Sequence, residues 1–572
     1  MQIDRLEARI HAGWMGKNIG GTLGGPLEGR MELLDVTGYT QSFVEAVEND
    51  DLDLQLVNLH AVEQYGGQVD AVLLGQEWLS HVHFQYDEYG HALTNLRQGL
   101  IPPLAGAYNN FFTDCMGAPI RSELWAMLCP GQPDLAAHYA YQDAMVDHAG
   151  GEGMYGEVFF AALESLAFVG GDARDLINRA LGYLPERSRV RQAVSLLLAC
   201  HDRGDPWQMA RERILERFGG ENFTYAPINV AFTLVGLLYE RGFTAQMLAT
   251  VNCGYDTDCT VATLGALLGI LHGPDYLDRQ WTEPLGERIL VSAPITGFDP
   301  PATIGELTRR TLAARERLTP PARLTVPGQA DWALQTRYLP AGSRDRWDLA
   351  VTLAYGEDHP VALPGGEKTV RVTLTNGQSC AQGLRVSLSP PPGFGVSAPA
   401  ALTLAPGARG EAAFTLRAPA VLPARLPCFL TVERLAGETV WDAQTLPVPL
   451  LPPFSWRVDG ERVHSATNRL TLSGPATLAT TLWAPTDREA LLIAVHAGPV
   501  VAELDGRPVI ASDEATPVIP AYHRADRRKS ARVALAAGSH TLTLRTERGG
   551  ELYVYLVDPK RQYACYTDVR FG

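Results

Sequence analysis

The sequence has 572 residues, more than one ordinary hydrophobic core accommodates, so roughly two to four domains are expected. Apolar residues make up 46% of the chain and charged residues 20%, a balance that excludes a disordered or fibrous protein. The net charge of -16 argues against nucleic acid or an anionic membrane as a general partner.

Neither a membrane span nor a secretory signal is expected. No apolar stretch is long enough to cross a bilayer, and the residues from Met1 lack a basic region followed by an apolar run. The eight cysteines are scattered and show no paired metal-ligand spacing. We interpret them as reduced thiols of a cytoplasmic protein.

An all-α domain is predicted over residues 1–320, and its first distinctive segment is Gly16–Gly29. This segment is rich in glycine and contains Pro26 followed closely by Glu28. One interpretation of Glu28 is a surface glutamate after a turn. The other is a functional carboxylate.

The second segment, Asn49–Asp53, places an amide and three carboxylates before a predicted helix. Helical spacing of apolar residues and two terminating glycines predict this helix: Leu52, Leu56, Leu59, Val62, Gly66 and Gly67. Asn or Asp at such a position usually caps a helix, and acidic groups favour its positive dipole end. Metal binding is the other interpretation, because divalent cations relieve the repulsion between crowded carboxylates.

The third segment, Asn109–Arg121, contains Gly117, which would allow a ligand to approach the backbone closely. Arg121 has two interpretations that the sequence does not separate. Its guanidinium contacts an anion, or it pairs with a carboxylate of the protein.

The fourth segment, Asp143–Gly156, combines His148 with a glycine-rich stretch. A lone histidine is usually a structural residue with its hydrogen bonds satisfied, and a cleft residue is the alternative. Gly153 and Tyr155 are interpreted as pocket walls, although the tyrosine also suits the core.

The fifth segment, Asn252–Gly273, opens with Asp256 and Asp258 one residue apart, and a helical pattern follows at once. One face of this helix is leucine and the other is small: Leu264, Leu267, Leu268 and Leu271 against Ala262, Gly265, Ala266 and Gly269. Glycine inside a helix costs roughly 1 kcal/mol relative to alanine, so we expect another backbone to approach the small face. Asp256 or Asp258 either caps the helix or holds a hard cation.

Beyond residue 320 the pattern changes. Proline-rich sequence predicts a linker over 321–345, followed by period-two patterns that predict two β-sandwiches, an immunoglobulin-like one over 346–452 and a jelly-roll-like one over 453–572. The expected strands are Thr369–Thr375, Glu411–Arg417, Thr477–Trp483, Leu491–Val495, Val500–Leu504, Ala531–Leu535 and His540–Leu544. The second sandwich resembles sugar-binding modules, so carbohydrate contact is a further expectation.

In this order, the five segments resemble the ADP-ribosylglycohydrolase family over about residues 8–273. That family is all-helical and uses two magnesium ions to cleave ADP-ribosyl glycosidic bonds. Its second metal signature, G-G-D-T-D-T, corresponds to Gly254–Cys259 here. Its first, T-D-D-T, corresponds to Asn49–Leu52. The two paired-aspartate signatures are the specific part of the resemblance.

The resemblance implies a metal site of Asn49, Asp50, Asp51, Asp256, Asp258 and Cys259. Asn49 stands where the family has its first threonine, and Leu52 replaces a second threonine that it cannot imitate. Cys259 replaces another threonine ligand, although a thiol is a poor partner for Mg²⁺. Either water fills that position or a different metal balance is tolerated.

The resemblance also implies roles in catalysis and substrate binding. Glu28 corresponds to a glutamate that gates the metals, while Gly21 stands where the family commonly has aspartate. Proton transfer and stabilisation of the cationic transition state are assigned to Glu28, Asp51 and Asp256. The substrate cleft is assigned to Gly117, Arg121, His148, Gly153 and Tyr155.

The leading hypothesis is a magnesium-dependent hydrolase that cleaves the anomeric bond of an ADP-ribosyl or related ribosyl group, free or linked to protein. One rival is a glycosidase acting on a nucleoside or another glycoside. A second is a catalytically inactive ligand-binding scaffold, favoured by Leu52 and Cys259 and opposed by the intact aspartates. Turnover separates the enzymes from the scaffold, and the choice of substrate separates the two enzymes.

Overall fold

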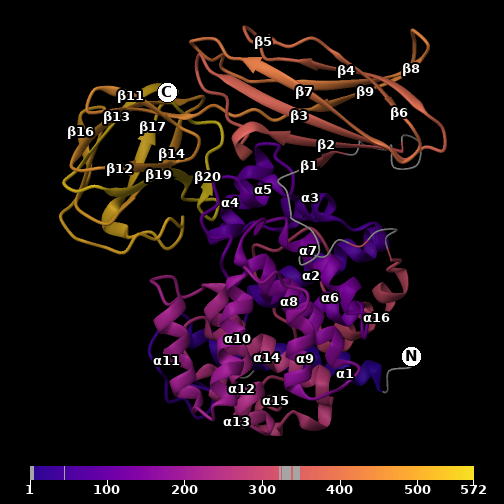
Figure 1. Ribbon diagram of the computed structural model, residues 1–572. Helices are drawn as coiled ribbons and strands as arrows, with labels where there is room; N and C mark the ends of the chain where they lie inside the picture. Colours follow the sequence, from indigo (N-terminus) through magenta and orange to yellow (C-terminus); the bar gives the residue numbers. More distant parts are fainter. Residues whose placement is uncertain (1–4, 44, 321–323, 325–335, 339–347) are drawn as a thin grey trace. The chain divides into compact units, whose positions relative to one another are not determined.

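A computed structural model describes residues 5–43, 45–320, 324, 336–338 and 348–572. Its contacts divide the chain into two compact units. The helical unit is Met1–Phe84 with Asn110–Trp332, and the strand-rich unit is Gln85–Asn109 with Ala333–Gly572. In Figure 1 the helices of the first are indigo to pink, and the strands of the second are orange to yellow. A helical region followed by antiparallel sheets is the fold class that the sequence predicts.

The helical unit is built from amphipathic and fully buried helices. Its α-helices are α1 (Leu6–Gly24), α2 (Asp50–Tyr65), α3 (Ala71–His81), α6 (Ser122–Leu128), α7 (Pro133–Ala144), α8 (Glu152–Ala167), α9 (Ala173–Leu181), α10 (Arg189–Asp202), α11 (Trp207–Phe218), α12 (Ala226–Tyr239), α13 (Phe243–Val251), α14 (Thr257–His272), α15 (Arg279–Thr282) and α16 (Ile304–Arg317). Short 3-10 turns follow α1, α2 and α14 as η1 (Gly25–Leu27), η2 (Gly66–Gln68) and η4 (Pro274–Tyr276), and η3 (Pro119–Arg121) directly precedes α6. None of the helices among the described residues combines the length and the apolar character needed to cross a bilayer.

Helices α1 and α14 pack backbone against backbone. A Cβ atom at Gly16, Gly20 or Gly24 of α1 would collide with the main chain of α14. A Cβ at Gly265 or Gly269 of α14 would in turn collide with carbonyl oxygens of α1. The prediction that another backbone approaches the small face of α14 is therefore confirmed. This approach brings the C-terminal end of α1 beside the first turn of α14.

The first sandwich of the strand-rich unit consists of two antiparallel sheets. One has the order β1 (Thr336–Tyr338), β2 (Leu349–Tyr355), β3 (Glu367–Asn376), β7 (Arg409–Arg417) and β5 (Gly395–Val396). The other has the order β6 (Ala400–Leu404), β4 (Gln382–Ser389), β8 (Phe429–Ala436) and β9 (Thr439–Pro447). Strand β1 lies within the expected linker 321–345, most of which is outside the described residues.

The second sandwich packs two further sheets around one apolar core. The first has the order β11 (Glu461–Ser465), β10 (Phe454–Val458), β13 (Ala476–Ala484), β18 (Gly538–Thr546), β15 (Val500–Leu504) and β16 (Arg507–Ser512), with β21 (Arg570–Phe571) beside β13. The second has the order β12 (Arg469–Leu472), β19 (Gly550–Asp558), β14 (Arg488–His496) and β17 (Ser530–Leu535), with β20 (Ala564–Cys565) beside β19. Inward-facing residues from both sheets, such as Leu482 and Leu492, fill the core. The turn after β15 has positive φ angles at Asp505 and Gly506, as its Asp-Gly sequence predicts.

The segment Gln85–Asn109 belongs to the strand-rich unit, although helical-unit sequence flanks it on both sides. It contains α4 (Asp87–Arg97) and α5 (Leu104–Ala107). Arg524 donates from Nε to the Asp87 carboxylate at 3.2 Å, and the His91 and Tyr522 rings lie 4.9 Å apart. Contacts with residues more than 400 positions away thus hold this segment.

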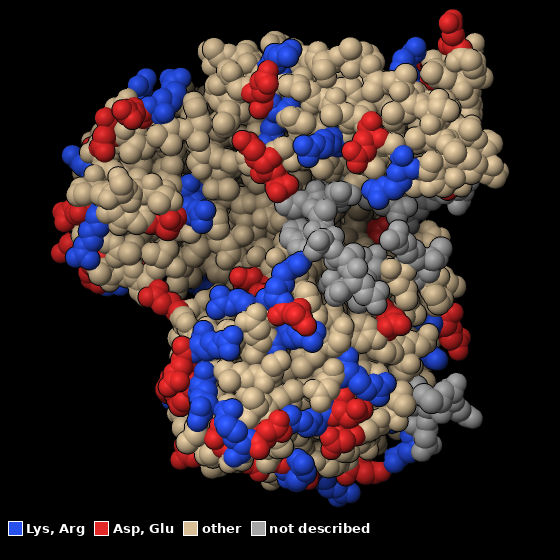
Figure 2. Space-filling view, in the orientation of Figure 1, with Lys and Arg blue, Asp and Glu red and all other residues tan. Residues whose placement is uncertain are grey.

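Acidic and basic side chains are interspersed over the face of the helical unit that Figure 2 presents. Ion pairs of the helical unit include Arg174 with Asp202 and Arg203 with Asp205.

Candidate active site

The two paired-aspartate segments meet at the glycine-lined end of α1. Asn49 caps α2, because its side-chain oxygen accepts the backbone N–H of Asp51 at 2.8 Å. At the start of α14, the Thr257 hydroxyl donates to the Gly24 carbonyl at 2.8 Å. Residues about 200 positions apart in the sequence therefore form one acidic cluster in the helical unit.

Three aspartates of this cluster carry buried carboxylate oxygens. Asp51 is 1% exposed, Asp256 is 2% and Asp258 is 8%. Asp51 Oδ2, Asp256 Oδ2 and Asp258 Oδ1 are buried and make no hydrogen bond within the described structure. Asp256 occupies the N-cap position of α14, yet its side chain makes no capping hydrogen bond. The interpretation of Asp256 as a mere helix cap is therefore wrong.

The potential ligand atoms form two overlapping groups. Oxygens of Glu28, Asp256 and Asp258 lie within 4.8 Å of one another, and so do the ligand atoms of Asp51, Asp258 and Cys259. Asp258 belongs to both groups. Glu28, directly after η1, is exposed, while its partners are buried. The structure thus brings Glu28 to the aspartates, as the sequence predicts.

Burial and mutual repulsion raise the pKa values of these carboxyl groups. Burial, followed by the charges of Asp51, Glu28 and Asp53, raises the pKa of Asp50 to about 8. Burial and then Glu28 raise the pKa values of Asp256 and Asp258 well above the ordinary range. The cluster is therefore costly to ionise without a compensating positive charge.

The donor set fits hard divalent cations. Carboxylate oxygens are the ligands that Mg²⁺ prefers, and bound cations remove the repulsion that raises these pKa values. The buried oxygens without hydrogen bonds on Asp256 and Asp258 are available for coordination, whereas Asp51 Oδ2 also faces the Lys17 ammonium at 3.3 Å.

Cys259 behaves as a neutral thiol in this cluster. Its Sγ lies 3.5 Å from Asp51 Oδ1, to which it donates a hydrogen bond. Burial and then the charges of Asp256 and Asp258 raise the pKa of the thiol well above its ordinary value. A protonated thiol is a weak ligand, so Cys259 orients Asp51 here, and metal binding by Cys259 stays a prediction.

Lys17 is a site residue that the sequence did not reveal. Its buried Nζ donates to Glu123 Oε1 at 2.8 Å and to the Ile120 carbonyl at 3.0 Å, and it lies 3.3 Å from Asp51 Oδ2. Burial alone would lower the pKa of Lys17, but the negative charges of Glu123 and Asp51 outweigh burial and raise the pKa above its ordinary value. Lys17 therefore stays charged and compensates part of the acidic cluster.

Asp53 lies beside the cluster rather than within the two ligand groups. Its carboxylate accepts hydrogen bonds from the Ser292 backbone N–H at 3.3 Å. Burial raises its pKa to about 7, although these hydrogen bonds oppose the rise. Asp53 thus joins the first turn of α2 to the backbone at Ser292.

Arg121 is fully buried and pairs with carboxylates of the protein. Its guanidinium contacts both oxygens of Asp147, at 2.9 and 2.8 Å, and Nε donates to Asp143 at 3.1 Å. A further contact joins it to the Gly117 carbonyl. These contacts agree with the interpretation that Arg121 pairs with carboxylates of the protein. Substrate contact by Gly117 and Arg121 stays a prediction.

The other expected cleft residues are also buried. His148 has no exposed surface, and its Nδ1 lies 2.9 Å from Asp147 Oδ1. Gly153 and Tyr155 lie in the first turns of α8 and are buried as well. Because these residues are buried, their role in substrate binding stays a prediction.

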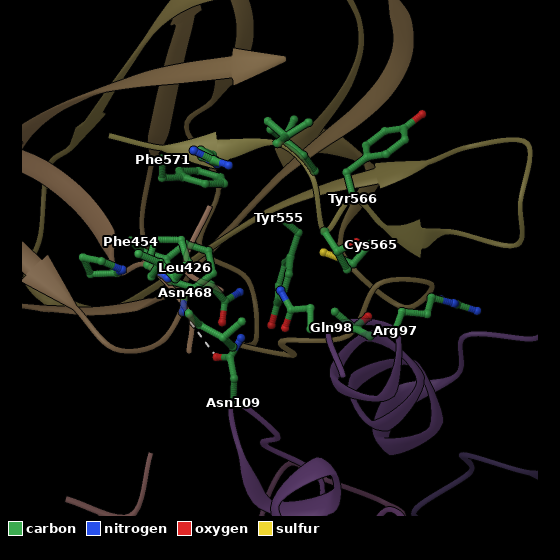
Figure 3. A pocket seen from close by; sticks show the side chains of 18 of the residues that line it. Arg97, Gln98, Asn109, Leu426, Phe454, Asn468, Tyr555, Cys565, Tyr566 and Phe571 are labelled. Carbon is green, nitrogen blue, oxygen red and sulfur yellow. Dashed lines mark hydrogen bonds between the residues drawn. The ribbon is translucent and has the colours of Figure 1, made fainter. Parts of the chain in front are cut away.

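The strand-rich unit has a pocket of its own, with a volume of about 540 Å³. Figure 3 shows the rings of Phe454, Tyr555 and Phe571 on its walls. Asn109 reaches the wall from the segment Gln85–Asn109 and accepts the Asn468 backbone N–H at 3.3 Å. The pocket therefore combines aromatic faces with amide groups.

Comparison with known proteins identifies the helical unit. The family model for ADP-ribosylglycohydrolase matches residues 2–321, more than half of the chain. A solved structure titled "ADP-ribosylglycohydrolase-related protein complex" is 18% identical and covers 55% of this chain and 99% of its own, with a TM-score of 0.37.

Other solved structures match smaller parts of the chain. An anti-sigma factor domain-containing protein from Clostridium clariflavum is 12% identical, covering 35% of this chain and 84% of its own at a TM-score of 0.15. A protein of unknown function from Porphyromonas gingivalis W83 is 15% identical and covers 39% of this chain and 97% of its own, with a TM-score of 0.16. No curated protein matches the chain. On the extent of the family-model match, the chain belongs to the ADP-ribosylglycohydrolase family.

Proposed function

We propose that this protein is a magnesium-dependent glycoside hydrolase that cleaves the anomeric bond of an ADP-ribosyl or related ribosyl substrate, free or attached to protein. Family membership supports a hydrolase function. The observation that carries the proposal is the acidic cluster, in which Asp258 belongs to two overlapping groups of ligand atoms. Buried carboxylate oxygens without a hydrogen bond are otherwise rare, because each costs free energy.

Two magnesium ions would be held by the aspartates of the two signatures. Asp51 and Asp258 would serve one ion, and Asp256 and Asp258 the other, with Glu28 at its rim. Asp50 supplies a further carboxylate, and Asn49 an amide oxygen that also caps α2. When bound, Mg²⁺ would lower the pKa of a coordinated water and would orient the ribose hydroxyls.

The chain's own residues would handle the proton and the developing charge. Glu28 is an exposed carboxyl group beside buried ones, a position from which it can exchange a proton at the leaving oxygen. Asp51 and Asp256 would place negative charge near the anomeric carbon as it becomes cationic. Cys259 donates to Asp51 and so restrains the orientation of that carboxylate.

The decisive test compares substitutions inside and outside the acidic cluster. Asp256→Asn and Asp258→Asn should each remove magnesium-dependent release of ADP-ribose from an ADP-ribosylated protein by at least a hundredfold, because each loses a charged ligand. Asp275→Asn, at an exposed residue that pairs with Arg5, is the matched control and should keep full activity. Retained activity in both cluster variants would sink the metal assignment.

The same assay separates the rival functions. Cleavage of simple ribosides or nucleosides without release of ADP-ribose would identify the altered glycosidase. Magnesium binding by calorimetry without turnover of either substrate class would identify the inactive scaffold. The buried position of Arg121 favours testing the smaller ribosides alongside ADP-ribosylated protein, since this arginine does not meet solvent.

Carbohydrate contact by the strand-rich unit is supported by the pocket of Figure 3. Sugars stack on aromatic faces and hydrogen-bond to amides, and Tyr555, Phe571 and Asn109 offer both. A glycan array with the full chain and with Phe571→Ala would test this contact. The cysteines, all free thiols, are consistent with a cytoplasmic location.

A further inference from the structure

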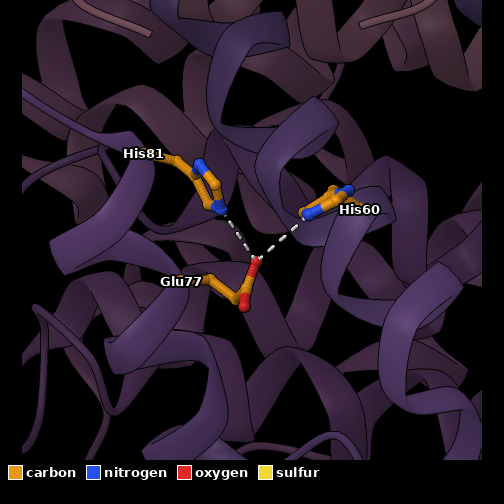
Figure 4. A group of neighbouring side chains, drawn as sticks. All are labelled: His60, Glu77 and His81. Atoms are coloured by element: carbon orange, nitrogen blue, oxygen red, sulfur yellow. Dashed lines mark ion pairs between the residues drawn. The ribbon is translucent and has the colours of Figure 1, made fainter. Parts of the chain in front are cut away.

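A second group of potential metal ligands lies in the helical unit, away from the acidic cluster. His60 is on α2, and Glu77 and His81 are one turn apart on α3. Figure 4 shows both imidazole rings directed toward the Glu77 carboxylate. His60 follows Asp50 by ten residues, about 15 Å along the helix axis, so the two sites use opposite ends of α2.

The spacing of the three ligand atoms matches that of a coordination shell. Glu77 Oε2 lies 3.3 Å from His81 Nε2 and 3.7 Å from His60 Nε2, and all three atoms lie within 4.8 Å of one another. Ligands held tetrahedrally about 2.0–2.1 Å from a zinc ion are roughly 3.3–3.4 Å apart. Small shifts of the side chains would therefore place all three atoms around one ion.

Hydrogen bonds outside the cluster orient its ligand atoms. The Thr296 carbonyl accepts from His81 Nδ1 at 2.8 Å, which leaves the Nε2 lone pair directed at Glu77. On the other side, the Tyr65 hydroxyl donates to Glu77 Oε1 at 3.0 Å, which leaves Oε2 for the histidines. This is the outer arrangement that metal-binding histidines and carboxylates usually have.

Glu77 Oε2 supplies independent evidence of a missing ligand. It is buried and makes no hydrogen bond within the described structure. His81 Nε2 and Glu77 Oε2 face each other at 3.3 Å. A divalent cation between them would be bound by a ring nitrogen and a carboxylate oxygen together.

An aromatic ring and a loop backbone pack against the two histidines of the cluster. Phe298 stacks on His60 with ring centroids 5.0 Å apart and meets His81 edge-on at 5.3 Å. Gly297 has φ +90°, which allows the loop backbone to lie against the His81 ring. Such walls hold ligand side chains in one orientation and exclude competing water.

We propose that His60, Glu77 and His81 bind one divalent transition-metal ion of the zinc type, separately from the magnesium site. Two imidazoles and one carboxylate form a donor set that favours zinc-type ions over Mg²⁺. Three protein ligands leave a fourth position for water or another ligand.

The test measures zinc retained by the full-length protein when Mg²⁺ is in excess, so that the acidic cluster does not compete. Metal-free protein is loaded with zinc, desalted and analysed by elemental mass spectrometry. One zinc ion per chain is expected for the wild type and for Asp256→Asn. Glu77→Gln and His81→Gln should bind zinc at least tenfold more weakly.

Controls separate loss of a ligand from loss of the fold. His201→Gln, on α10 outside the cluster, is the matched control and should retain zinc. Circular dichroism checks that each variant is folded. Because His60 is partly exposed, His60→Gln removes a ligand with less disturbance of the packing than the other two substitutions.

X-ray absorption at the zinc edge supplies the second readout. Scattering from two imidazoles and no sulfur is expected. Equal zinc retention in the wild type and all three cluster variants would overturn the proposal. A sulfur ligand in the spectrum would overturn it as well, because it would place the zinc at a cysteine.

Discussion

At the scale of single residues, Lys17 and the acidic cluster depend on each other. Replacing Lys17 by Met would leave Glu123 and Asp51 buried without their cation, which typically costs about 3–5 kcal/mol. Urea denaturation of Lys17→Met should therefore show a strongly lowered free energy of unfolding. The exposed ion pair of Arg5 with Asp275 is the control, and Arg5→Met should change stability by less than about 1 kcal/mol.

A double variant checks the cause of the Lys17 effect. Adding Glu123→Gln to Lys17→Met removes one buried charge while keeping a group that can hydrogen-bond near Gln55. Part of the lost stability should return. If Lys17→Met alone is as stable as the wild type, the buried cation is not what compensates these carboxylates.

The raised pKa values of Asp50 and Asp53 predict how stability depends on pH without metal. In the folded protein these groups keep their protons up to about pH 8 and 7, whereas in the unfolded chain they lose them near pH 4. Between those values the folded state binds more protons, so the free energy of unfolding falls as pH rises. The slope is about 1.4 kcal/mol per pH unit for each proton by which the states differ.

Calorimetry in a chelator buffer at several pH values measures this slope. Asp53→Asn removes one of the two groups and should flatten it. Saturating Mg²⁺ should offset the fall, because cations replace the protons as pH rises. A metal-free protein that grows more stable from pH 5 to about pH 8 would contradict the assignment.

Residue types predicted part of this site and could not predict the rest. Glu28, Asp51, Asp256 and Asp258 form recognisable short segments, and the structure brings them together. The contacts of Lys17 and Arg121 could not be predicted in this way, because their partners lie on other helices of the folded unit.

The pair His60 and Glu77 is a similar case. The spacing of Glu77 and His81 places them one turn apart on a helix, which is a weak signal of metal binding. Only the packing of α2 against α3 adds the third ligand.

At the scale of elements, the contact of α1 with α14 should tolerate no added side-chain atom. Gly20→Ala gains up to about 1 kcal/mol of helix propensity, but its methyl group collides with the main chain at Val261 and Ala262. Overpacking of this kind typically costs about 1–3 kcal/mol, so net destabilisation is expected in chemical denaturation. Gly305→Ala in α16 is the matched control, since that position is helical and has open space around it.

The Gly20 variant also reports on the acidic cluster. Forcing α1 away from α14 would move Gly24 and Thr257 apart and should weaken magnesium binding. If the Gly20→Ala protein has the denaturation midpoint and the magnesium affinity of the wild type, α1 and α14 do not pack as closely as described.

Elements with strong local patterns could be predicted from sequence. The periodicity of α2 and α14, the glycines that end them and the Asp505-Gly506 turn are local signals, and the structure contains each. Sequence alone does not identify the helix that packs against α14. Helix α1 lies some 250 residues earlier, and its glycines indicate close packing but not the partner.

At the scale of the whole molecule, α4 depends on the end of the chain. Tyr522 is buried against His91 and Tyr555, so Tyr522→Ala should leave a cavity between α4 and the second sandwich. Hydrogen exchange of the amides in Asp87–Arg97 is expected to accelerate by at least tenfold, because local opening becomes easier. Val421→Ala removes a side chain that is 84% exposed and should leave exchange in α4 unchanged.

The opposite result for Tyr522 has a clear meaning. Unchanged exchange in α4 would show that Gln85–Asn109 is held by other contacts of the strand-rich unit, such as the pair of Arg524 with Asp87. Arg524→Ala would then be the variant that accelerates exchange. Sequence order alone does not reveal this membership, since Gln85–Asn109 is flanked on both sides by helical-unit sequence.

The distant partners of Gln85–Asn109 have a consequence for synthesis on the ribosome. His91 and Tyr522 are 431 residues apart, so the helix leaves the exit tunnel long before its partner exists. At about 5–20 residues per second, that interval is roughly 20–90 s, far longer than a helix needs to form. During this time the nascent chain exposes the side of α4 that later packs against Tyr522.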